Sequence, residues 1–124
     1  MNIKAWIVAK LLANSALTTA IGGQSHLLSQ HPGIITAFPC LIYTEANHRT
    51  TGYFDNVATA VESTIVFDIY TSGGTTSTIF DALQSVMAGL MYNLDFSSDV
   101  PDADLNVRHK TCRYRRMIRA EDLV

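Results

Sequence analysis

The segment AVESTIVFDIYT, residues 60–71, constrains the possible folds more than any other part of the sequence. Apolar and polar side chains alternate along it. Because successive side chains of a strand point to opposite faces of a sheet, the segment predicts a strand with one buried face. The residues assigned to that face are Val61, Ile65, Phe67 and Ile69. Such a strand requires a covering layer, since its apolar face has to be buried against another element.

A helix is predicted directly after this strand. Residues 72–74 (SGG) end the alternation. In residues 75–94, apolar residues then recur every three or four positions, as on one face of an α-helix. This stripe consists of Ile79, Leu83, Val86, Met87, Leu90 and Leu94.

The remaining segments complete a small α+β domain. Residues 3–13 carry apolar residues at helical spacing and predict a first helix, to which residues 16–21 can add a turn. Residues 38–44 and about 106–119 predict strands, whereas residues 45–56 and 95–104 are polar and predict loops. We expect one domain over residues 1–124, with a small antiparallel or mixed sheet of about four strands and two helices packed on one face.

Composition excludes several classes of protein. The chain has 124 residues, of which 48% are hydrophobic and 16% charged, which is typical of a compact domain rather than a disordered chain. The net charge of −2 argues against general affinity for nucleic acid or anionic membranes, so electrostatic contacts must be local. No apolar run approaches the ~20 residues that span a membrane. Lys10 interrupts the N-terminal apolar segment, which favours a helix over a signal peptide.

No motif predicts catalysis, a cofactor or a metal site. Residues 72–75 (SGGT) precede the predicted helix, as phosphate-binding loops do, but the following lysine of such loops is missing, so a glycine turn explains them better. The histidines lack metal-ligand spacing; they are His26, His31, His48 and His109. Cys40 and Cys112 fall on alternate strand positions that suit buried thiols. We therefore expect no enzyme, and spacing alone leaves open a Cys–His pair that meets only in space.

Positive charge is concentrated near the C-terminus, where six of the nine lysine and arginine residues lie within residues 108–119. On an alternating strand, Arg113, Arg115 and Arg119 point to one face together with Met117. The residues assigned to the opposite face are Cys112, Tyr114, Arg116 and Ile118. We call Arg113, Arg115 and Arg119 the arginine row.

The arginine row has three interpretations: a solvated surface with weak ion pairs, a nucleic-acid site, or a contact with other protein subunits. Nucleic-acid binding is disfavoured, because the row lacks interleaved exposed aromatic residues and does not lie on a helix that could enter a major groove. Arginine is enriched at protein interfaces, and the chain supplies carboxylates in Asp99, Asp102 and Asp104. A basic side and an acidic side favour head-to-tail association of copies, which closes into rings.

The order of these elements resembles the tail terminator (tail-completion, head–tail joining) proteins of long-tailed bacteriophages and prophages. The resemblance rests on short strings spread over nearly the whole chain. A helix ends in AIGG, a strand begins with a proline in PCLIY, and an alternating strand ends in IVFDIYTSGG. The helix IFDALQSVMAGL and the arginine-containing strand CRYRRMIR follow.

The resemblance implies a structural protein of the virion, made in the cytoplasm of the host bacterium. Six copies are expected to form a ring that caps the tail tube and docks the head-completion or connector protein. Arg113, Arg115 and Arg119 would lie at subunit or neck contacts, with acidic partners in residues 95–104, among them Asp99, Asp102 and Asp104. Residues 45–56 would form a mobile docking loop. The residues expected to dock from it are Arg49, Tyr53 and Phe54.

Alternative functions remain on the sequence alone. The arginines could touch genomic DNA that passes through the channel of the ring. The chain could also be a small nucleic-acid-binding protein that uses the basic strand, another neck or minor tail protein, or a small hydrolase. No cofactor, metal or membrane is expected for the favoured function.

Overall fold

The computed structural model describes residues 3–29, 33, 35, 38–54, 57–73, 75–100 and 106–119, and for residues 46–54 and 57–59 it describes the backbone only. The elements are α1 (Ile3–Ala13), α2 (Ser15–Ile21), the 3₁₀ turn η1 (Gln24–His26), β1 (Leu27–Leu28), β2 (Cys40–Phe54), β3 (Val57–Ser72), α3 (Ser77–Gly89), β4 (Asn93–Val100) and β5 (Val107–Arg119). None of the described helices is long and apolar enough to cross a membrane.

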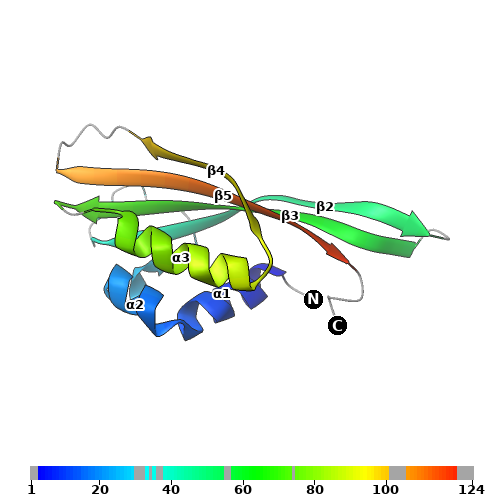
Figure 1. Ribbon diagram of the computed structural model, residues 1–124, viewed down its shortest axis with the longest axis horizontal. Helices are drawn as coiled ribbons and strands as arrows, with labels where there is room; N and C mark the ends of the chain where they lie inside the picture. The colour runs from blue at the N-terminus through cyan, green and yellow to red at the C-terminus, as the bar shows by residue number, and fades with distance from the viewer. Residues whose placement is uncertain are drawn as a thin grey trace.

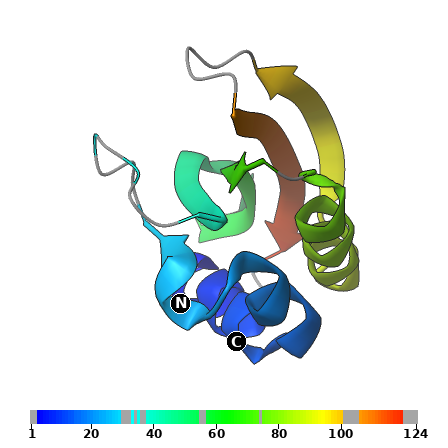
Figure 2. The ribbon, with the colours of Figure 1, turned by 90° about the vertical axis from the view of Figure 1, so that its left-hand side faces the viewer.

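The strands form one mixed sheet in the order β1-β2-β3-β5-β4, and the helices lie on one side of it (Figures 1 and 2). β1 pairs with β2 in parallel, and the other neighbours are antiparallel. The predicted α+β class is therefore confirmed. The described sheet has five strands rather than about four, and three α-helices rather than two cover its face.

The main hydrophobic core lies between the helices and the inner face of the sheet. The alternation predicted for β3 is confirmed, because Ile65, Phe67 and Ile69 are buried beneath the helices. The rings of Phe67 and Tyr114, on neighbouring strands, meet edge to face with their centroids 5.9 Å apart. The helical side chains of the core are Ile3, Ile7, Leu11, Leu17, Ile21, Ile79, Leu83 and Met87.

The extra turn predicted after the first helix is a separate helix, α2. The break lies at Asn14, whose backbone is extended and whose side chain accepts a 2.8 Å hydrogen bond from the backbone N–H of Leu17. An asparagine in this position caps a helix N-terminus, because it satisfies an N–H that has no partner within the helix.

The prediction of a loop over residues 95–104 was wrong for its first part, which forms β4. Leu94, assigned to the helical stripe, also lies in β4, because α3 ends at Gly89. β4 is an edge strand with most of its residues exposed, so no buried face imposed an apolar alternation on it. Pairing of its backbone with β5 forms the strand instead.

The prediction of a loop over residues 45–56 was also wrong for most of its length. The backbone from Glu45 to Phe54 continues β2 and pairs with β3 through register shifts near Glu45, Thr50 and Gly52. Figure 1 shows this hairpin extending past the helical layer. Backbone pairing with β3 forms this part of β2, although its polar sequence lacks the alternation that predicts a strand.

Candidate interaction surface

The arginine row lies on the outer face of the sheet, away from the helices. The alternation predicted for this strand is confirmed: Cys112, Tyr114 and Ile118 are buried, whereas the row and Met117 are exposed. Arg116 points inward, where its Nη1 donates a 2.9 Å hydrogen bond to the carbonyl oxygen of Leu90 at the end of α3. β5 therefore joins the core on one side and presents guanidinium groups on the other.

Arg113 has an acidic partner within the same chain. Its Nε donates to Asp95 Oδ2 at 3.1 Å, and its guanidinium lies 5.6 Å from the centroid of the Phe96 ring. Asp95 falls where the β4–β5 register shifts between Leu94 and Phe96. The Arg113 side chain is 48% exposed and that of Asp95 34%, so the pair contributes little to stability, ~0–1 kcal/mol.

The other predicted charges are arranged differently. The guanidinium of Arg115 is exposed, and none of the ion pairs among the described residues involves it. Asp99 Oδ1 lies 3.8 Å from Lys110 Nζ rather than near the row, and its side chain is 83% exposed. Asp102 and Asp104 lie outside the described residues. The guanidinium of Arg115 thus stays exposed to solvent, and the Asp99 carboxylate, beside Lys110, stays mostly exposed as well.

The three docking residues predicted in the 45–56 segment lie on the strand hairpin. The backbone of Arg49 pairs with Glu62, that of Tyr53 with Ala58 and that of Phe54 with Val57. Their side chains lie outside the described part of the chain. The structure places their backbones along an arm of two paired strands (Figure 1).

Sequence reasoning missed a polar cluster at the opposite end of the outer face. His109 Nε2 lies 2.8 Å from Asp68 Oδ1, and the His109 ring stacks on Tyr70 with centroids 4.1 Å apart. Tyr70 packs with Cys40 and Ile42 in a second, smaller apolar cluster. The alternation of β3 already put Asp68 and Tyr70 on one face, but only the pairing of β3 with β5 brings His109 to them.

The two cysteines are free and buried, as predicted from their strand positions. Burial raises the pKa of each thiol from 9.0 to about 11. The thiolate is the reactive form of cysteine, so both side chains are protonated and weakly nucleophilic near neutral pH. Within the described part of the chain, no group of three or more His, Cys, Asp or Glu side chains could hold a metal.

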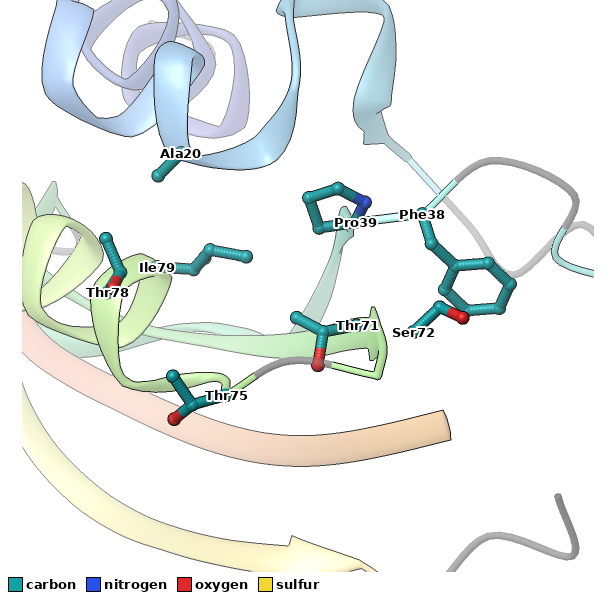
Figure 3. Close-up of a pocket in the computed structure, with 8 residues that line it drawn as sticks. All are labelled: Ala20, Phe38, Pro39, Thr71, Ser72, Thr75, Thr78 and Ile79. Carbon is teal, nitrogen blue, oxygen red and sulfur yellow. The ribbon is translucent and has the colours of Figure 1, made fainter. Parts of the chain in front are cut away.

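A cavity of about 360 Å³ lies at the N-terminus of α3 and is lined by threonine, serine and apolar side chains (Figure 3). Its lining contains no acidic, basic or thiol group. Gly73, with a φ of +73°, makes the turn between β3 and the helix. The positive φ agrees with the glycine turn predicted before the helix. The lining of the cavity has no group that could transfer a proton near neutral pH.

Residues 5–119 match the protein family described as Tail completion protein gp17. The chain belongs to this family. The matched range includes all five described strands, α2, α3 and most of α1. A tail completion protein is a structural component of a virion, which fits a molecule whose arginine row lies on an open sheet face.

The fold of this tail completion protein also occurs in a solved structure. A chain from the virion of a native gene transfer agent particle superimposes with a TM-score of 0.64, covering 92% of each chain at 12% sequence identity. At this identity the likeness shows a shared fold. No curated protein sequence matches the chain.

Proposed function

We propose that this tail completion protein is a tail terminator: six copies form a ring that caps the tail tube and joins the tail to the head connector. The observation that carries the proposal is the family match over residues 5–119. We propose no catalytic role, since the work of such a protein is to stop polymerisation of the tube and to present a surface to the next component.

The arginine row supplies one set of contacts in this proposal. Arg115 and Arg119 project from an exposed sheet face, and planar guanidinium groups pair well with carboxylates of a neighbouring molecule. Arg113 already contacts Asp95, so it enters such a contact as part of a charged pair. Asp99 is exposed, and with Asp102 and Asp104 it offers carboxylates to a neighbouring subunit or neck protein.

The hairpin of β2 and β3 supplies the second set. We propose that its outer part, which carries Arg49, Tyr53 and Phe54, contacts the tail tube or the connector. Support comes from its position, because the paired strands extend beyond the helical layer (Figure 1).

Charge reversal of the row tests this function. The double variant Arg113→Glu with Arg115→Glu is expected to weaken ring formation and to give particles with unjoined heads and tails, as seen by negative-stain microscopy. Arg108→Glu is the matched control, because Arg108 is an exposed arginine of the same strand that alternation directs to the other face. Normal joining by the double variant would remove the row from the mechanism.

Contact with DNA in the channel is a second candidate role for the row. It is favoured by Arg115, whose exposed charge has no acidic neighbour among the described ion pairs. A salt titration distinguishes the two roles. The binding constant for duplex DNA is measured at several salt concentrations. A logarithm of this constant that falls linearly with the logarithm of the salt concentration, with a smaller slope for Arg115→Glu, would support DNA contact.

A further inference from the structure

We propose that β4 of one copy pairs edge to edge with the outer part of β2, residues 47–54, of the next copy, so that the sheets of neighbouring copies join into one continuous sheet. The proposal rests on the proposed function, because it names a contact between neighbours in the ring. It uses backbone groups at the two edges of the sheet rather than the arginine row.

The first edge is β4, the last strand in the order of the sheet (Figure 2). Among the described residues, no strand pairs with the side of β4 that faces away from β5. The backbone groups of an antiparallel strand alternate in direction, so about half of those in β4 point away from β5. Such a row of N–H and C=O groups can pair with the strand of another chain.

β4 lacks most of the features that normally prevent pairing at a sheet edge, namely proline, lysine, a very short strand or a bulge. It has eight residues and contains no proline, lysine or arginine. A register shift interrupts it only between Leu94 and Phe96, and residues 96–100 pair regularly with β5. Leu94 is 39% and Phe96 48% exposed, so a strand placed beside β4 would also bury apolar surface.

The second edge belongs to β2. β1 pairs with β2 only at Leu41 and Ile42. Residues 47–54 continue β2 beyond the helical layer, where β3 pairs with one side of the strand and no described strand pairs with the other (Figure 1). This stretch is as long as β4 and contains no proline or lysine. The sheet therefore has two open edges of equal length on its opposite sides.

Strand direction favours a second copy of this chain as the partner. β2 is antiparallel to β3, β3 to β5, and β5 to β4, so β4 runs opposite to β2. A rotation about an axis along the strands keeps their directions, and β4 of one copy then meets β2 of the next in the antiparallel arrangement, which is the more stable pairing. The same rotation keeps the helices of every copy on one side of the joined sheet, where they do not block the contact.

The two edges also match in register. If residues 93–100 are aligned over their full length against residues 54–47, Ser98 comes to lie opposite Arg49. Ser98 pairs with Thr111, two positions before the arginine row, so it belongs to the outer face. Arg49 pairs with Glu62, which pairs with the exposed Met117 on the same outer face. Full overlap of the two edges therefore keeps outer positions beside outer positions.

The contact can repeat from copy to copy. Because the two edges lie on opposite sides of one molecule, pairing through β4 leaves residues 47–54 of the same copy open to a further neighbour. A heterologous contact of this kind closes into a ring when the rotation between copies allows it, and closure removes every open edge. The arginine row stays exposed on the outer face, one strand away from each junction.

Pairing of β4 with β4 of another copy is the competing arrangement. It is twofold symmetric, so it stops at two copies and leaves residues 47–54 uncovered. The charged residues of β4 are Asp95 and Asp99, and strands that pair with like charges opposite each other are destabilised. The charged residue of residues 47–54 is Arg49, so the proposed pairing adds no like charge.

Disulfide formation between single cysteine variants tests the pairing. Ser98→Cys is mixed with Arg49→Cys in the presence of oxidised glutathione, and crosslinked dimers are measured by electrophoresis without reductant. The matched control is Ser98→Cys with Thr50→Cys. Thr50 is the next residue of the same edge, but it pairs with Val61 and therefore belongs to the inner face. Because a disulfide requires adjacent Cβ atoms, the first mixture is expected to crosslink at least about tenfold faster.

The variants measured alone distinguish the two arrangements. Ser98→Cys by itself is expected to remain uncrosslinked, because the proposed contact does not bring β4 beside β4. The natural Cys40 and Cys112 are buried and do not compete for the oxidant. Circular dichroism verifies that each variant is folded. Crosslinking of Ser98→Cys alone would show the twofold arrangement and overturn the proposal.

Proline substitutions test the edge itself. Successive N–H groups of β4 point in opposite directions, so one of Ser97 and Ser98 directs its N–H away from β5. Proline at that position is expected to keep the fold, as at other sheet edges, and to weaken self-association at least about tenfold. Proline at the other position removes a bond to β5 and is expected to lower Tm. Sedimentation velocity over a concentration series measures association, and circular dichroism measures Tm.

Failure of this contact is distinguishable from failure of the proposed function. Rings that form in the unchanged protein and in a folded proline variant alike, with no preference of Ser98→Cys for Arg49→Cys, would overturn edge pairing and leave the ring itself intact. An unchanged protein that stays monomeric, alone and with tail tubes, would overturn the proposed ring and this contact with it.

Discussion

The hydroxyl of Tyr92 donates a 2.8 Å hydrogen bond to the hydroxyl of Ser63, 29 residues earlier in the chain. Both residues are almost fully buried, with 3% and 1% of their surface exposed. The bond joins the segment between α3 and β4 to the centre of β3. It satisfies two polar groups that burial would otherwise leave without partners.

Removing one member of this pair is expected to cost more than removing both. Tyr92→Phe leaves the Ser63 hydroxyl unsatisfied in the core, and Ser63→Ala does the same to Tyr92, so each is expected to lower the free energy of unfolding by about 1–3 kcal/mol. The double variant is expected to lose less than the sum of the single losses. Urea denaturation of all four proteins measures this coupling; strictly additive losses would contradict it.

The buried thiols are expected to make folding sensitive to alkaline pH. The pKa of Cys40 and of Cys112 is raised from 9.0 to about 11 in the folded chain, so the unfolded chain loses these protons first. The resulting stability is complete below pH 9 and is lost as pH rises towards 11, by up to ~1.4 kcal/mol per pH unit for each thiol. Urea denaturation between pH 8 and 11 checks the slope, which Cys40→Ala should reduce.

The cap between α1 and α2 is expected to respond to a single substitution. Asn14→Ala removes the acceptor for the Leu17 N–H and should lower the free energy of unfolding by about 1 kcal/mol. Asn14→Asp keeps an acceptor and serves as the control. Thermal unfolding followed by circular dichroism compares the two, and equal losses would show that the side chain is not the cap.

Two residues of the arginine row, Arg113 and Arg115, are expected to differ in their contribution to stability. Arg113→Glu breaks the contact with Asp95 and replaces it with repulsion, so the variant should lose up to ~1 kcal/mol of unfolding free energy at low salt. Arg115→Glu is expected to leave unfolding unchanged. Denaturation at low and high salt separates them, because screening should remove the loss in Arg113→Glu.

Much of the fold could be predicted from the sequence, because the periodicity of a buried strand or helix is a property of the residues within that one element. The inner face of β3 and the stripe of α3 repeat at the spacing of one strand face and one helix face. The same reasoning separated the buried Cys112, Tyr114 and Ile118 from the exposed row in β5. These elements touch the core, and the core requires apolar residues at fixed intervals.

Elements without a buried face could not be predicted in this way. β4 lies at the edge of the sheet with most of its residues exposed, and the polar outer part of β2 extends beyond the helices; in both, the sequence lacks a periodic signal, and the observed strands are defined by backbone pairing. The sequence offered residues 95–104 as acidic partners of the arginines but did not assign pairs, whereas register places Asp95 beside Arg113 and Asp99 beside Lys110 within one chain.

The sequence by itself determined the fold class, the buried faces and the exposed position of the arginine row, since these depend on the spacing of apolar residues along a single element. Only the tertiary structure decided which charges meet, that His109 reaches Asp68, and that Met91 takes a glycine conformation at the surface. Those relationships depend on strand register and chain reversal, which bring together residues whose separation in the sequence carries no periodic signal.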